Sequence, residues 1–143
     1  MKFKKVIGML LAGVMLMSTV PVFAGNIDNE NYTVWTSGAG AEQKIAHRPK
    51  KNATKVYTRV DKSPQYRMQV RVYGYLNGHY INKTKGEYAY VNRGTNSSIT
   101  NFIYEVGYRN ASMAFRTTGG ENYYGYATGV WSPDSFQNYK VVN

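Results

Sequence analysis

One segment of the sequence carries nearly all of its excess positive charge. Residues 44–71 contain nine Lys or Arg side chains against one acidic residue, Asp61, which gives the segment a net charge of +8. Clustered Lys and Arg side chains bind phosphate and carboxylate groups, and neighbouring tyrosine rings stack on sugars or bases. The segment therefore predicts a surface that binds an anionic polymer. A solvated basic surface that only keeps the protein soluble is the alternative.

Few residues of the sequence are suited to catalysis or metal binding. The chain has no cysteine, and its two histidines, His47 and His79, match neither the ligand spacing of a zinc site nor a serine in a GxSxG context. Residues 28–31, DNEN, lack the glycine and the distal glutamate of a calcium-binding loop. We therefore expect a non-enzymatic protein without a metal or other cofactor, unless acidic residues distant in the sequence converge in a pocket.

The side chains of the basic segment must be positioned by β-strands, because strand patterns dominate the chain after residue 30. Segments rich in Tyr, Val, Thr and Phe alternate with clusters of Gly, Asn, Ser and Pro. The expected strands are 32–36, 55–60, 66–76, 88–92, 100–109, 112–117 and 123–131. About seven such strands predict an all-β fold, an antiparallel β-sandwich or alternatively a small barrel. Only residues 41–48, AEQKIAHR, are compatible with a turn or two of helix.

The clearest local prediction is a β-hairpin at Asn77-Gly78. Asn-Gly between two apolar and aromatic runs favours a two-residue type I′ turn, because both residues tolerate a positive φ. This turn fixes the register and pairs Tyr75 with Tyr80. Alternation along residues 66–76 then directs the apolar side chains to a core and the others outward. The outward strip consists of Arg67, Arg71, Tyr73, Tyr75 and Tyr80.

Glycine and tryptophan positions lead to further expectations. Tyr-Gly-Tyr occurs at 73–75 and at 124–126, and glycine inside a strand marks a bulge, a bend or the close approach of another group. We expect the glycine of each triplet to allow the sheet to curve. The alternative is that the glycine leaves a groove for a flat ligand. Trp35 and Trp131 are both expected to be core residues.

The N-terminus has the pattern of a secretory signal peptide. Three lysines within residues 2–5 precede an apolar run at 6–20, which is followed by Pro21 and a small-residue junction at Ala24. A retained membrane anchor is the alternative, since the run approaches the length that spans a bilayer. We expect cleavage after Ala24 and secretion of a single all-β domain, residues 25–143, without a further membrane-spanning segment. The lack of cysteine fits export from a bacterium.

The export signal, the cysteine-free chain rich in Tyr and Gly, and the closing YYGYATGVWSPDS at 123–135 resemble small secreted β-rich proteins of Gram-positive bacteria. More loosely, the chain is similar to the lactococcin-like bacteriocins. The likeness covers the general build of residues 25–143 and no diagnostic motif, so it assigns no functional residue. What it implies is an exported protein that acts on the envelope of competing bacteria.

Together these features predict a secreted binding protein that acts at an anionic surface of the bacterial cell envelope, with an antibacterial role as an extension. Its expected partner is an anionic envelope polymer, such as teichoic acid, or the acidic headgroups of a membrane. A carbohydrate-binding module or a single-stranded nucleic-acid-binding module is the alternative, although export disfavours nucleic acid. The predicted binding residues are Lys50, Lys51, Lys55, Arg59, Arg67, Arg71, Tyr73, Tyr75 and Tyr80.

Overall fold

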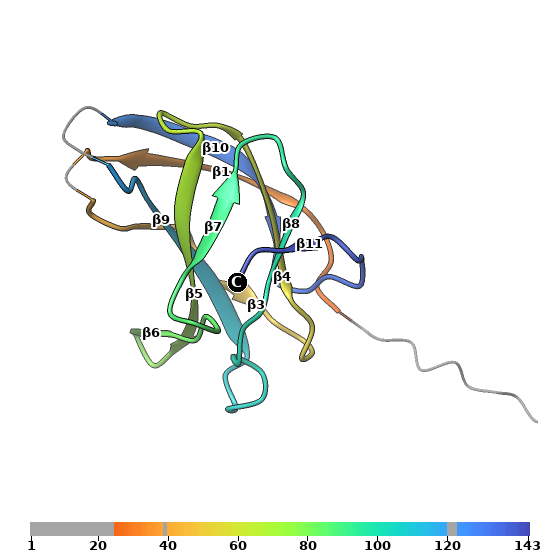
Figure 1. Cartoon of the computed structure of the whole chain (residues 1–143). Helices are drawn as coiled ribbons and strands as arrows, with labels where there is room; N and C mark the ends of the chain where they lie inside the picture. Colours follow the sequence, from red (N-terminus) through yellow and green to blue (C-terminus); the bar gives the residue numbers. More distant parts are fainter. Residues whose placement is uncertain (1–24, 39, 120–122) are drawn as a thin grey trace, which may run out of the picture.

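The computed structural model describes residues 25–38, 40–119 and 123–143 (Figure 1). Within these residues the chain forms eleven β-strands and no helix, so the predicted all-β fold is confirmed. It follows that this part of the chain has no helix of the length and apolarity needed to cross a bilayer. The predicted signal peptide lies outside the described residues.

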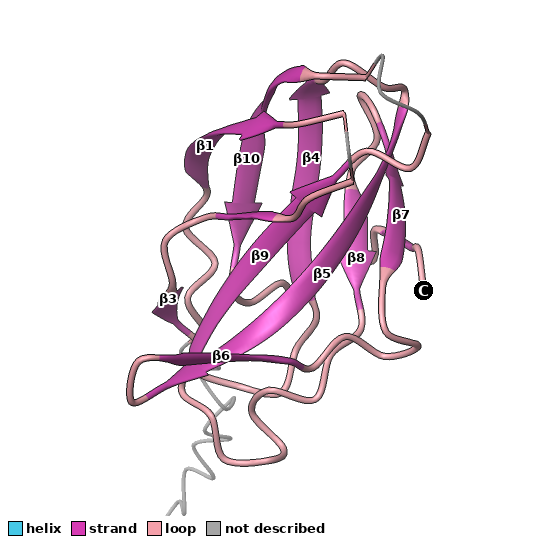
Figure 2. Cartoon of the chain, turned by 90° about the vertical axis from the view of Figure 1, so that its left-hand side faces the viewer, coloured by secondary structure: helices cyan, strands magenta, loops and turns pink. Residues whose placement is uncertain are grey.

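The strands form two sheets, which appear as two layers in Figure 2. Neighbouring strands of the first sheet are antiparallel, except that β11 runs parallel to β8. The order of the first sheet is β1 (Glu30–Thr36), β10 (Gly125–Ser132), β4 (Val56–Lys62), β8 (Ser97–Ile99) and β11 (Lys140–Val141).

The second sheet is built around two long central strands that pair with each other. These are β5 (Arg67–Leu76) and β9 (Asn110–Arg116). On its other side β5 pairs first with β7 (Ala89–Asn92) and then with β6 (His79–Asn82). The free side of β9 is covered by two short strands, β2 (Gln43–Lys44) and β3 (Arg48–Pro49).

The core lies between the two sheets and takes alternate positions of their strands. Met68, Val70 and Val72 of β5 are fully buried, as are Val56 and Val60 of β4. Burial of side chains of this size stabilises the fold by roughly 1.5–3 kcal/mol each. Because both sheets direct these side chains inward, Arg59 of β4 and Arg71 of β5 project from opposite outer faces of the molecule.

The two tryptophans differ in their environment. Trp131 is 2% exposed and lies in the core, which confirms its prediction. Trp35 is 48% exposed, so its prediction as a core residue is wrong. The inward positions of β1 belong to Tyr32 and Val34, and alternation along the strand therefore points Trp35 outward.

The predicted hairpin is present with the predicted register. Asn77 and Gly78 have φ values of 50° and 83°, and Tyr75 pairs with Tyr80. The glycine of the first Tyr-Gly-Tyr triplet marks a close approach: a Cβ on Gly74 would lie 2.8 Å from the ring of Tyr108.

Two further segments differ from what the sequence suggested. Residues 100–109 do not form a strand; the strand precedes them as β8, and Asn101 starts a compact turn in which the Tyr108 amide donates to the carbonyl of Ile103. Residues 41–48 are extended rather than helical. The Ile45 amide donates to the carbonyl of Met113, so pairing with β9 overrides the local helical preference.

Candidate functional site

The basic residues of segment 44–71 do not gather on one face of the fold. Arg59 projects from β4 on the outer side of the first sheet, where its Nε lies 2.6 Å from a carboxylate oxygen of Asp61. Arg71 projects from β5 on the outer side of the second sheet, where its Nη1 lies 2.7 Å from Glu42. These two predicted binding residues therefore point in opposite directions, and each has an acidic partner.

Lys50 is buried rather than exposed, which removes it from any binding surface. Its Nζ lies 2.9 Å from Asp134 Oδ1, and both side chains are 0% exposed. The ammonium also donates to the carbonyls of Thr54 and Pro133, at 2.6 and 2.7 Å. Burial lowers the pKa of Lys50, and the Asp134 carboxylate opposes that shift.

Asp134 completes a clamp that ties together distant parts of the chain. Its Oδ2 accepts hydrogen bonds from the backbone amides of Asn26 and Lys51, at 2.7 and 2.9 Å. A buried ion pair whose polar atoms are satisfied in this way holds structure in place and does not recruit a ligand. Of the predicted residues in this region, Lys51 and Lys55 are exposed.

Tyr73 is also unavailable to a ligand. It is 8% exposed, and its hydroxyl donates to the Glu42 carboxylate that also pairs with Arg71. Burial raises the pKa of Tyr73, and the hydrogen bond to Glu42 raises it further. On the second sheet, the Glu42 carboxylate thus contacts both the Arg71 guanidinium and the Tyr73 hydroxyl.

Tyr75 and Tyr80 form an aromatic cluster with a histidine that the sequence analysis did not select. The His47 ring stacks on Tyr75, with centroids 3.8 Å apart and planes 14° apart. The ring centroids of Tyr80 and Tyr75 lie 4.7 Å apart, and the Tyr80 hydroxyl oxygen is 3.4 Å from His47 Nδ1. Because residues 43–49 extend along β9 instead of coiling, His47 reaches across to the hairpin. No local sequence signal indicates this contact.

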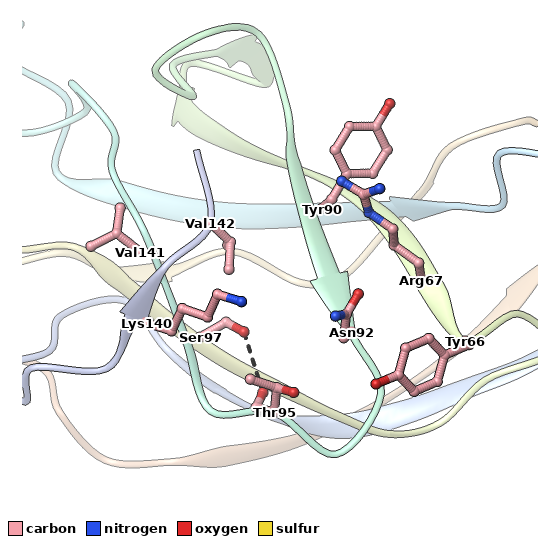
Figure 3. A pocket seen from close by; sticks show the side chains of 9 residues that line it. All are labelled: Tyr66, Arg67, Tyr90, Asn92, Thr95, Ser97, Lys140, Val141 and Val142. Atoms are coloured by element: carbon pink, nitrogen blue, oxygen red, sulfur yellow. Dashed lines mark hydrogen bonds between the residues drawn. The ribbon is translucent and has the colours of Figure 1, made fainter.

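A cleft of about 460 Å³ opens where the C-terminal strand bridges the two sheets (Figure 3). The Val142 amide donates to the carbonyl of Ser98 in β8, and the Tyr90 amide of β7 donates to the carbonyl of Val142. The cleft is lined by Tyr66, Arg67, Tyr90, Asn92, Thr95, Ser97, Lys140, Val141 and Val142.

The described residues that line the cleft include two cations and no acidic side chain. The Arg67 guanidinium lies 4.0 Å from the centroid of the Tyr90 ring, a cation–π contact that leaves its N–H groups available. In Figure 3 the Lys140 ammonium points toward Asn92, and the Tyr66 hydroxyl points from the other side toward Thr95. In the described part of the chain, neither Arg67 nor Lys140 forms an ion pair with a carboxylate. The cleft is therefore suited to an anionic group.

Arg67 is the one predicted binding residue in this cleft, and its partners there come from elsewhere in the chain. Asn92 stands opposite Arg67 in the pairing of β5 with β7, and Tyr90 stands opposite Gln69. The residue pattern predicts a strand at 88–92 but not the strand with which it pairs. Lys140 lies in a segment for which no strand was expected.

A family model described as "Protein of unknown function (DUF2712)" matches residues 20–135. The chain belongs to this family. Tyr66, Arg67 and Asn92 fall inside the part of the DUF2712 chain that the model covers, whereas Lys140 lies beyond it. Comparisons with curated proteins and with solved structures return no match.

Among the residues that the structure describes, no three His, Cys, Asp or Glu side chains lie together in a way that could hold a metal ion. What the cleft offers is positive charge, an amide and tyrosine hydroxyls, which are groups that bind an anion.

Proposed function

We propose that this DUF2712 protein is an exported, non-enzymatic binding protein that holds an anionic polymer of the bacterial cell envelope. The supporting observation is the cleft in which Arg67 and Lys140 form no ion pair with any acidic side chain that the structure describes. Phosphate or carboxylate groups along the polymer accept hydrogen bonds from the two cations, while the Asn92 amide and the Tyr66 hydroxyl contact the adjoining hydroxyl groups of the polymer.

Two of the nine predicted residues, Lys50 and Tyr73, drop out of this proposal because they are buried. Arg59 and Arg71 contribute little, because Asp61 and Glu42 neutralise them. The anion site is thus narrower than the basic segment, and its location depends on Arg67. Export follows from the sequence pattern of residues 1–24 and is part of the proposal.

The test compares cleft cations with exposed cations elsewhere. The purified protein, residues 25–143, is titrated with teichoic acid of glycerol phosphate type and with liposomes containing phosphatidylglycerol. Arg67→Ala and Lys140→Ala each remove a charge-assisted hydrogen bond worth about 1.5–3 kcal/mol. Each is therefore expected to weaken binding about tenfold or more, since 1.4 kcal/mol is a factor of ten.

Lys51→Ala and Lys55→Ala are the matched controls, because both residues are exposed and neither lines the cleft. They remove the same charge and are expected to change affinity by less than about twofold. Binding must also weaken between low and physiological salt. Equal losses for control and cleft variants, or no binding of either probe at low salt, would contradict the proposal.

Antibacterial action is a separate consequence of envelope binding. It predicts that the purified protein inhibits lawns of related bacteria and that Arg67→Ala reduces the inhibition. Lawns that grow normally would limit the role to binding alone.

A further inference from the structure

Three large aromatic side chains stand exposed together on the outer face of the first sheet. Trp35 of β1 is 48% exposed, Tyr126 of β10 is 61% exposed and the adjoining Tyr124 is 63% exposed. Aromatic side chains of this size usually bury most of their surface in a core or an interface. We call these three residues the aromatic platform.

The platform is held in place by the sheet beneath it. Trp35 and Tyr126 are cross-strand partners, with ring centroids 4.9 Å apart and planes 76° apart. Tyr124 extends the group, with its ring centroid 6.4 Å from that of Trp35. The alternate side chains Val34 and Ala127 are buried in the core and anchor the two strands. The rings are therefore positioned before any ligand arrives, which limits the entropic cost of binding.

The surroundings of the platform favour a neutral ligand. The next outward pairs along β1 and β10 are Thr33 with Thr128 and Asn31 with Val130, all uncharged. On the neighbouring strand β4, Arg59 and Asp61 neutralise each other, and the exposed Lys62 opposite Thr128 is the remaining charge. The face therefore contrasts with the cationic cleft. It combines apolar rings with a short row of hydroxyl groups.

We propose that the aromatic platform is a second binding site, which takes the sugar rings of a neutral glycan. A pyranose presents a face of C–H groups that packs on an aromatic ring, while its hydroxyls point sideways toward polar groups. Trp35 and Tyr126 offer the rings, and Thr33 and Thr128 offer adjacent hydroxyls. The platform lies on the outer face of the first sheet, whereas Arg67 projects from the second. The protein binds a neutral polymer independently of its anion site.

The test uses insoluble chitin and cellulose as neutral pyranose polymers and soluble chitooligosaccharides for titration. Because Trp131 is buried and Trp35 is exposed, a change of tryptophan fluorescence on titration reports mainly on Trp35. Trp35→Ala and Tyr126→Ala are each expected to reduce affinity at least tenfold. Phe102→Ala is the matched control, since Phe102 is 46% exposed and lies in the turn after β8. It is expected to leave binding unchanged.

The outcomes separate this site from the anion site. Binding to neutral polymer is expected to be insensitive to salt and unaffected by Arg67→Ala. Failure to bind chitin and cellulose, or equal losses for Trp35→Ala and Phe102→Ala, overturns the proposal and leaves the anion site untouched. Binding of the platform to anionic liposomes, or a dimer in light scattering that Trp35→Ala abolishes, also overturns it. Those results assign the platform to a membrane or to a second copy of the chain.

Discussion

Replacing Asp134 by Asn removes the carboxylate that accompanies the buried ammonium of Lys50. Both side chains are 0% exposed, and Lys50 Nζ lies 2.9 Å from Asp134 Oδ1. Asn keeps the shape of the side chain but carries no charge, and it offers one acceptor oxygen in place of two. The amides of Asn26 and Lys51, which now donate to Oδ2, then compete with the ammonium for that acceptor.

The free energy of unfolding is expected to fall by about 3–5 kcal/mol, the typical cost of leaving a buried charge without its partner. A domain of this size has a stability of roughly 5–15 kcal/mol, so the variant loses a large share of it. With a denaturant slope of about 2 kcal/mol/M, the urea midpoint falls by roughly 2 M. Asp61→Asn is the matched control. It breaks the Arg59 pair, whose side chains are 39% and 41% exposed, and is expected to cost less than about 1 kcal/mol.

Urea unfolding followed by the fluorescence of the buried Trp131 measures both variants. The double variant Lys50→Met/Asp134→Asn is expected to recover part of the loss, because no uncompensated charge then remains in the interior. A midpoint shift for Asp134→Asn no larger than that for Asp61→Asn would refute this reasoning. Lys50 would then have to be exposed, which is what the sequence-based prediction of Lys50 as a binding residue requires.

Two further predictions concern packing and alkaline pH. Gly74→Ala is expected to lower the free energy of unfolding by about 1–3 kcal/mol, because the added Cβ would lie 2.8 Å from the Tyr108 ring. In thermal melts, the same substitution made in a Tyr108→Ala background should cost less stability. An equal loss in both backgrounds would argue against the clash. Burial raises the folded-state pKa of Tyr32 and Tyr73 above the ordinary 10.0, so their stabilising contribution is present below pH 10 and is lost as pH rises further. Absorbance at 295 nm should show tyrosines that ionise late, together with unfolding, whereas ionisation of every tyrosine near pH 10 without unfolding would contradict the shift.

The sequence by itself determined the all-β fold, the core side chains Met68, Val70 and Val72 and the register at Asn77-Gly78, whereas Leu76 at the end of the same strand is exposed. Each of these depends on a local signal. The period of two residues separates the faces of a strand, and the Asn-Gly turn sets which residues stand opposite each other. Such signals need no knowledge of which strand lies beside which.

Local signals failed where partners distant in the sequence decide the outcome. The extended path of residues 41–48 depends on pairing with β9, and the exposure of Trp35 depends on which face of β1 meets the core. Lys50 looks like any exposed lysine in its own segment. The Asp134 carboxylate that accompanies its burial lies 84 positions away.

The location of the candidate site was decided by tertiary structure alone. Because β4 and β5 belong to different sheets, Arg59 and Arg71 face opposite sides despite sharing one basic segment. Arg67 and Lys140 line one cleft because β11 pairs with β8 and the Val142 backbone connects β8 to β7. The sequence shows how many Lys and Arg side chains the protein has. Whether each of them is neutralised or available to a ligand depends on which acidic side chains the folded chain places beside it.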